Sequence, residues 1–229
     1  MKISAQQKER VRATIERSAE RLFRKHGFNA ATTRQIATAA GVATGTVFNY
    51  FPTKDDLGLA LLRHAFELAN QDFQDHRRGD ESLPEDLFAY LWSCFKRLKP
   101  NRAFAGEVLQ RTAAFGTATS DTVTSQRGEG RSPIPAKGNR SPQSAEASLG
   151  DASTTLTRSG FLRPIDEILK RHGIVPSVLD QHLFTALWLG IAGFWSRDKS
   201  ANQEDSMVVL DRSMHLFADH LSSATREPK

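Results

Sequence analysis

The feature of this chain that most narrowly limits its fold lies in residues 33–50, where two short apolar-periodic segments flank one tight turn. A small residue, Ala37, is followed four positions later by Gly41, which can take the positive φ that such a turn needs. Val47, six positions further on, can close the helix pair from its far side. The second segment, from Thr44 to Tyr50, is short and ends before a proline. The spacing predicts a helix-turn-helix.

The residues before this pair predict a first helix of the same small domain. Apolar residues recur three and four positions apart from Val11 to Phe23, and the pattern should end at His26-Gly27, because glycine adopts a left-handed helix cap without strain. Thr32 with Gln35 forms a capping box for the next helix. We therefore expect a three-helix domain over residues 1–52 and a larger domain over residues 53–229.

The net charge of +5 is concentrated at the N-terminus. Residues 1–52 hold nine Lys and Arg against three Glu, whereas the remainder holds 22 basic against 23 acidic residues. A basic segment ahead of a nearly neutral body is typical of a domain that neutralises nucleic-acid phosphates. A solvated helix face is the alternative explanation of the same charges.

Residues 32–57, TTRQIATAAGVATGTVFNYFPTKDDL, resemble the signature of the TetR-type (TetR/AcrR) family of helix-turn-helix transcriptional regulators. The most specific portion is AGV-x-x-GT-x-x-x-YF-x-x-K, which begins at Ala40 and ends at Lys54. The resemblance implies DNA contacts from Thr33, Thr44, Thr46, Tyr50 and Lys54, with Gly45 allowing close approach. The remaining candidates for this surface are Thr32, Arg34, Phe48 and Asn49.

Two departures from the family pattern affect this assignment. Ala43 and Phe48 stand where the family often has Ser and Tyr, so each position lacks a hydroxyl. Thr44 would then either cap the recognition helix or, with Thr46, read base edges through its hydroxyl and methyl groups. Phe48 would keep only a packing role, and Tyr50 has core packing as its alternative to a DNA contact.

The rest of the chain predicts an all-α ligand-binding and dimerisation domain, since helical periodicity recurs without strand alternation. A long helix from Thr53 to about Asp75 should connect the domains, with Phe66 and Phe73 reaching into the larger one. The family resemblance implies that the last two helices, near residues 177–195 and 205–222, pair with their copies in a homodimer; ordinary intrachain core is the alternative. Their apolar stripes consist of Leu183, Leu187, Gly190, Ile191, Phe194, Met207, Leu210, Met214, Phe217 and Leu221.

An effector site is less clearly marked. Aromatic residues at helical spacing are expected to line an apolar cavity for an aromatic or otherwise apolar small molecule, with simple core packing as the alternative. These candidates are Trp92, Phe95, Phe104, Phe115, Phe161 and Trp188.

Residues 116–160 form an unusual segment, because 24 of the 45 are Gly, Pro, Ser or Thr and none is aromatic. Such a composition buries too little apolar surface to order a chain, so we expect disorder. A mobile loop over the effector site and a stretch read from a shifted coding frame are both compatible with it.

Several classes of protein are not indicated. The chain carries no nucleophile elbow, P-loop, dinucleotide-binding glycine pattern or zinc-protease motif, so we expect neither an enzyme nor a cofactor or metal. It has one cysteine, Cys94, and no apolar run of membrane-spanning length, which predicts a cytoplasmic protein. The expected function is a repressor that binds a palindromic operator as a dimer and is released by a small molecule. The alternative is a DNA-binding protein that no longer responds to a ligand.

Overall fold

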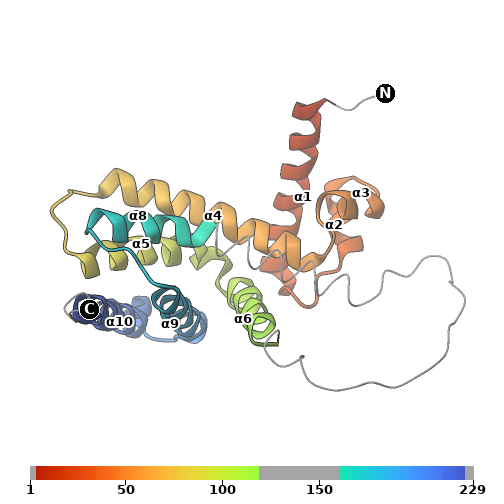
Figure 1. The fold of residues 1–229 in the computed structure, drawn as a ribbon. Helices are drawn as coiled ribbons and strands as arrows, with labels where there is room; N and C mark the ends of the chain where they lie inside the picture. Colours follow the sequence, from red (N-terminus) through yellow and green to blue (C-terminus); the bar gives the residue numbers. More distant parts are fainter. Residues whose placement is uncertain (1–3, 119–159, 225–229) are drawn as a thin grey trace, which may run out of the picture.

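The computed structural model describes residues 4–118 and 160–224, and within these ranges the chain forms helices and no strand (Figure 1). The glycine- and serine-rich insert therefore lies almost wholly outside the described residues. The expected all-α class is confirmed. The helices are α1 Ala5–His26, α2 Thr33–Ala40, α3 Thr44–Tyr50, α4 Lys54–His76, α5 Leu83–Leu98, α6 Arg102–Ala118, α8 Leu162–Arg171, α9 Val178–Arg197 and α10 Glu204–Ala224, with 3-10 turns η1 Lys99–Asn101 and η3 Ala201–Gln203.

The first three helices form the predicted small bundle. α1 begins at Ser4, whose hydroxyl accepts a hydrogen bond from the Gln7 amide at 3.1 Å, and it ends at Gly27 with φ +81°. The buried apolar faces of the three helices meet in one core. Its members from these helices are Ile15, Ala19, Phe23, Ile36, Ala37 and Val47.

The turn between α2 and α3 has the geometry that its sequence predicts. Gly41 adopts the left-handed conformation, with φ +67° and ψ +31°, and its N–H donates to carbonyls in the last turn of α2. The Val42 N–H donates to the Ala37 carbonyl at 3.0 Å, which closes the cap. A residue with a Cβ would be strained at this φ, so the crossing of α2 and α3 depends on glycine here.

The connector α4 spans 23 residues, or roughly 34 Å at 1.5 Å per residue. A capping box between Thr53 and Asp56 fixes its start. Further along, Phe66 lies 5.1 Å from the ring of Phe161, and Phe73 lies 5.9 Å from the ring of Tyr90. One rigid helix thus extends from the small bundle into the core of the larger domain, as its sequence predicted.

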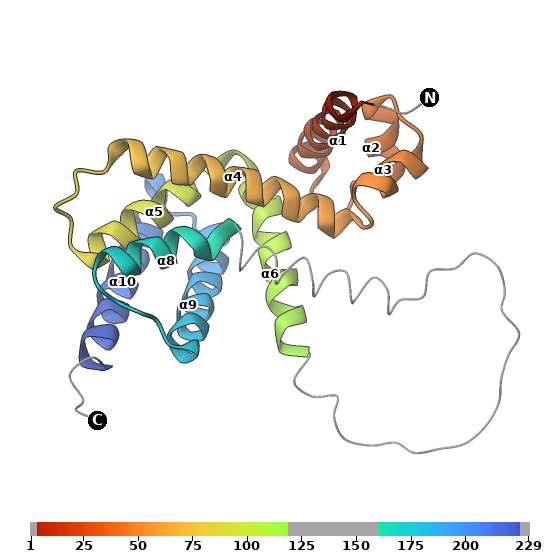
Figure 2. The same cartoon turned by 45° about the horizontal axis from the view of Figure 1, so that its top comes forward.

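The larger domain packs α5 between α4 and α10, and α6 against α9 (Figure 2). α6 and α9 approach closely at Gly106, where an added Cβ would lie 2.5 Å from the Cβ of Ser196. In both views α2 and α3 lie at the end of the molecule away from α9 and α10 (Figures 1 and 2). Across the described ranges, no helix combines the length and apolar character needed to cross a membrane.

The apolar stripe predicted on α10 faces inward. Leu210, Met214, Phe217 and Leu221 are buried within the chain, and the Phe217 ring lies 5.4 Å from that of Phe184. Ile191 on α9 is buried as well, whereas Phe194 and Met207 are partly exposed. For these inward residues the alternative of intrachain core is the one that the structure supports.

Candidate DNA-binding surface and effector domain

Helix α3 buries one of its side chains completely in the core of its own domain. Val47 is buried, whereas Gly45, Phe48 and Asn49 are exposed and Thr44, Thr46 and Tyr50 are half-buried. Phe48 keeps 42% of its surface exposed, so its ring is available to an external partner. A short helix that presents most of its side chains outward suits contact with another molecule.

The start of α3 resolves the question raised by Ala43. Ala43 is the N-cap and contributes no side-chain hydrogen bond, and the Thr44 hydroxyl does not replace it. Thr44 is therefore not the capping residue, and its hydroxyl has no hydrogen-bond partner among the residues that the structure describes.

The start of α2 is capped by its own residues. The Thr32 hydroxyl accepts from the Gln35 amide at 3.2 Å, and the Thr32 amide donates to the Gln35 side chain at 2.8 Å. Thr32 therefore acts first as a cap, while Thr33 is half-buried and Arg34 is exposed. Of these three candidates, Arg34 offers the charge that a phosphate contact uses.

Lys54 has a different environment from the one its sequence position suggested. Its ammonium donates to the carbonyls of Phe28, Asn29 and Ala31 at 2.8, 3.2 and 3.2 Å, and it lies 4.7 Å from the centroid of the Phe28 ring. Burial lowers the pKa of Lys54, and Asp55 partly opposes this shift. Since an ammonium has three N–H donors, a phosphate would have to displace one of these carbonyls.

The two domains touch through contacts that the sequence analysis did not identify. The Phe104 ring on α6 lies 5.4 Å from that of Phe23 on α1, so Phe104 packs in the contact between the two domains. Asn101 donates to Glu20 at 2.7 Å. Periodicity marked Phe104 as inward-facing but carried no information about which helix it meets.

An ion pair joins the start of α4 to α6. Arg111 donates to the carboxylate of Asp55 at 2.7 Å, immediately after the helix-turn-helix. Gly58 lies one turn further along, where an added Cβ would come within 3.0 Å of both Phe28 and Val108. A displacement of α6 would therefore be transmitted directly to the base of the small bundle.

Three of the predicted effector residues gather in the core of the larger domain. Trp188 stacks on Phe95 with centroids 5.0 Å apart and on Phe161 at 4.5 Å. All three side chains are buried and pack on one another. Trp92 is half-buried at the margin, edge-on to Phe95 at 6.4 Å. Phe115 belongs to the last turns of α6, whose side chains lie outside the described residues.

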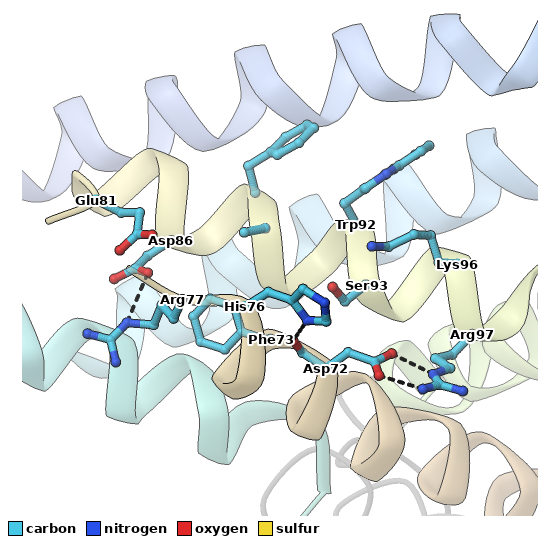
Figure 3. Close-up of a pocket in the computed structure, with 12 residues that line it drawn as sticks. Asp72, Phe73, His76, Arg77, Glu81, Asp86, Trp92, Ser93, Lys96 and Arg97 are labelled. Atoms are coloured by element: carbon cyan, nitrogen blue, oxygen red, sulfur yellow. Dashed lines mark hydrogen bonds and ion pairs between the residues drawn. The ribbon is translucent and has the colours of Figure 1, made fainter. Parts of the chain in front are cut away.

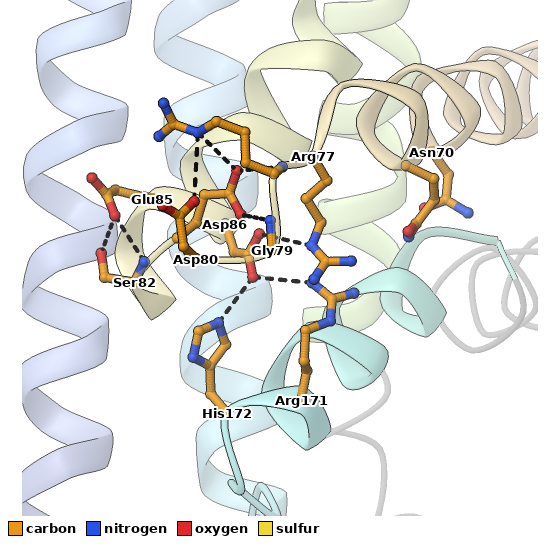
Figure 4. A network of polar contacts seen from close by, with 12 residues as sticks. Asn70, Arg77, Gly79, Asp80, Ser82, Glu85, Asp86, Arg171 and His172 are labelled. Atoms are coloured by element: carbon orange, nitrogen blue, oxygen red, sulfur yellow. Dashed lines mark hydrogen bonds and ion pairs between the residues drawn. The ribbon is translucent and has the colours of Figure 1, made fainter.

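A buried carboxylate joins three segments of this domain (Figure 4). Asp86, with 2% of its side chain exposed, contacts Arg171 at 3.0 Å and His172 at 2.9 Å, both at the end of α8. On its other side Arg77, just after α4, approaches to 3.6 Å. Such a buried charge is tolerable because several charged donors surround it, and the removal of Asp86 would leave two arginines without their partner.

One C-terminal histidine, His220, pairs with a carboxylate. His220 contacts Asp180 at 2.9 Å, which joins the start of α9 to the end of α10. Within residues 4–118 and 160–224, no three His, Cys, Asp or Glu side chains are placed to hold a metal ion.

Comparison with known proteins gives consistent matches. Residues 15–61 match the family profile described as "Bacterial regulatory proteins, tetR family". The HTH-type transcriptional repressor NicS of Pseudomonas putida is 31% identical over 99 residues, which cover 42% of this chain and 46% of that protein. The chain thus matches about half the length of this curated relative.

The similarity in fold extends over nearly the whole chain. A TetR transcriptional regulator from Rhodococcus sp. RHA1 superposes with a TM-score of 0.64 at 19% identity, covering 91% of this chain and 96% of that one. Thermus thermophilus FadR, a TetR-family repressor solved in complex with lauroyl-CoA, gives a TM-score of 0.58 at 19% identity, covering 90% and 93%. The helix-turn-helix segment thus matches the tetR family of bacterial regulatory proteins, and the chain as a whole has the fold of the TetR regulators of known structure.

Proposed function

We propose that this protein is a transcriptional repressor that binds a palindromic operator as a homodimer and leaves it when a small molecule binds the larger domain. The observation that carries the proposal is the exposure of α3, which buries Val47 and presents Thr44, Thr46, Phe48 and Asn49 outward. NicS and Thermus thermophilus FadR are named as repressors, which supports the direction of regulation.

Within this proposal the DNA contacts divide by chemistry. Thr44, Thr46 and Asn49 are the candidates for base edges, since each carries a hydrogen-bonding group on the exposed helix. Phe48 would contact a thymine methyl or the sugar edge, because its ring is apolar and partly exposed. Arg34 and Tyr50 would hold the phosphate backbone, with Gly45 allowing close approach.

The dimer rests on apolar side chains that the single chain leaves uncovered on α9 and α10. Leu179 is 69% exposed, Val208 52% and Leu216 69%, and Phe194 and Met207 are partly exposed as well. Burial of such residues against a second copy would remove them from water. Val208 and Leu216 lie on the face of α10 opposite its buried stripe, so the proposed interface uses that face of the helix.

Oligomeric state tests the interface directly. We expect wild type to sediment as a dimer and the double variant Val208→Asp, Leu216→Asp as a monomer, because each carboxylate would be buried without a partner. Ala103→Asp, at an exposed position on α6, is the matched control and should remain a dimer. A wild-type protein that is monomeric at micromolar concentration would contradict the proposed dimer.

DNA binding is tested by fluorescence anisotropy with a duplex from upstream of the protein's own gene and a scrambled duplex of equal composition. We expect a preference for the upstream duplex, an affinity that falls with salt, and a changed base preference for Thr46→Ala. Equal affinity for both duplexes would contradict the proposal. Specific binding that no compound in a metabolite panel relieves would favour the alternative, a DNA-binding protein without ligand response.

A further inference from the structure

A groove of about 580 Å³ lies between the C-terminal end of α4 and one face of α5 (Figure 3). It is separate from the packed cluster of Phe95, Phe161 and Trp188, and it has the size of pockets that hold small ligands. Phe88, Trp92 and Lys96 line it at intervals of four residues, which places them along one face of α5.

The apolar part of the groove is an aromatic wall. The rings of Phe88 and Trp92 are nearly parallel, with centroids 6.3 Å apart and planes 13° apart, and both side chains are half-buried. Rings aligned in this way offer an extended apolar surface to another flat ring. Trp92 also contacts Phe95, so a ligand on this wall would touch the aromatic core of the domain through one residue.

The acidic groups of the groove already have partners. Arg97 donates to both carboxylate oxygens of Asp72, at 2.6 Å through Nε, and the hydrogen bond from Arg97 holds the pKa of Asp72 below its ordinary value. Glu81 accepts from the backbone amides of Arg78 and Gly79, which lower its pKa to about 2. Both carboxylates are therefore ionised at neutral pH and engaged.

The lining holds three carboxylates and three Lys or Arg side chains, and Lys96 is the cation among them that has no close partner in the described residues. Lys96, one turn beyond Trp92, has no hydrogen bond or ion pair within residues 4–118 and 160–224; its charge acts on Asp72, which Arg97 already pairs. At the other end Arg77 shares the single carboxylate of Asp86 with Arg171. Among the residues that the structure describes, the buried Nε atom of Arg77 has no hydrogen-bond partner. The groove thus joins an apolar aromatic wall to the ammonium of Lys96, which no carboxylate within residues 4–118 and 160–224 pairs.

We propose that this groove binds a planar aromatic carboxylate, with its ring against Phe88 and Trp92 and its negative charge at Lys96. A carboxylate there would form a charge-assisted hydrogen bond with the ammonium, and the ring would cover the exposed aromatic faces. This inference builds on the proposed function because it names the class of effector. Binding at this site does not itself require DNA.

The test uses the full-length protein and two probes of the same shape, 2-naphthoate and the neutral 2-naphthamide, measured by isothermal titration calorimetry. We expect the acid to bind wild type at least about tenfold more tightly than the amide, a difference of about 1.4 kcal/mol. Lys96→Gln should remove that preference and leave the affinity for the amide unchanged. Trp92→Ala should weaken both probes, and Lys199→Gln, at an exposed lysine after α9, should alter neither.

The location of the probe has an independent readout. The chain has three tryptophans, of which Trp188 and Trp195 are buried and Trp92 borders the groove. In a proton–nitrogen correlation spectrum, naphthoate should shift chiefly the indole signal that Trp92→Phe removes. Circular dichroism of each variant checks that its helices are intact.

Several results would overturn the assignment: no binding of naphthoate at millimolar concentration, equal affinity for acid and amide, or the same effect from Lys96→Gln and Lys199→Gln. A shift confined to the indoles of Trp188 and Trp195 would also overturn it. Because calorimetry contains no DNA, naphthoate binding without operator binding would contradict only the proposed function. Operator binding without naphthoate binding would contradict only this site.

Discussion

Lys54→Met separates two roles for a lysine that the family pattern associates with DNA. The substitution keeps an apolar stem near the Phe28 ring but removes the ammonium that contacts the carbonyls of Phe28, Asn29 and Ala31. These contacts join the start of α4 to the loop between α1 and α2, over 23 to 26 positions of sequence. If these contacts are the main role of Lys54, the substitution should lower the stability of the protein and should not remove a specific contact with DNA.

The magnitude follows from the three bonds. A well-shielded hydrogen bond to a charged group contributes roughly 1.5–3 kcal/mol. The three bonds of Lys54 share one ammonium, whose desolvation opposes them, and they are partly open to water. We therefore expect the free energy of unfolding to fall by about 2 kcal/mol in total. For a chain of this size, that loss lowers the melting temperature by roughly 4–8 °C. Amide exchange at Ala31, whose N–H donates to the Gly27 carbonyl at 3.3 Å, should also become faster.

Thermal unfolding and hydrogen exchange of Lys54→Met are compared with those of Lys8→Met, which removes an exposed lysine of α1. DNA affinity is then measured over a range of salt. A lysine bound to phosphate contributes about 0.9 to the slope of log affinity against log salt. Lys54→Met could instead have the melting temperature and exchange rate of wild type, together with a salt-dependence slope that is lower by that amount. This result would refute the structural role and support a phosphate contact for Lys54.

Three further changes test other parts of the fold. Gly106→Ala should destabilise the protein by about 1–3 kcal/mol in urea unfolding, because the added Cβ would lie 2.5 Å from Ser196. Gly193→Ala is the control and should not destabilise it, because its Cβ would lie near only Arg197, at 3.8 Å. Equal effects of the two substitutions would contradict the close helix crossing. Burial alone would raise the pKa of Asp198, but hydrogen bonds from Ser200 and Ser206 outweigh it and hold the pKa below 3.8. The ionised carboxylate therefore contributes to the free energy of unfolding above pH 3.8, and this contribution disappears as the pH falls below that value. Asp198→Asn should therefore lower the free energy of unfolding at neutral pH and have a shrinking effect in acid; an effect that is independent of pH would argue against the carboxylate. Burial raises the pKa of Cys94, so alkylation by iodoacetamide should proceed only as fast as the protein unfolds, and rapid labelling of native protein would contradict the packed position.

The small N-terminal domain was predictable from sequence because its determinants are local. The capping box of Thr32 and Gln35, the positive φ of Gly41 and the plug at Val47 lie within sixteen consecutive positions, and each operates over a few residues. The short α3 and the start of α4 follow from the same kind of signal. The family pattern lies in this same region, so its fold and its resemblance to the family both follow from local sequence.

Only the tertiary structure decided what the other helices meet. Periodicity identified the apolar stripe of α10, but it could not distinguish α5 and α9 of the same chain from a second copy, because either neighbour buries the same residues. It likewise marked Phe104 as inward-facing without showing that its neighbour is Phe23, 81 positions earlier.

The partners of polar residues were even less predictable from the sequence. In sequence Asp86 is a helix-start carboxylate, yet the fold surrounds it with Arg77, Arg171 and His172, the last two 85 and 86 positions away. Lys96 became notable only when the fold placed it beside Trp92 at the edge of a groove. Local sequence therefore determined which segments are helices and where the DNA-binding motif lies. Contacts between distant segments determined the groove and the buried charges, because they depend on how helices pack and not on the period of any one helix.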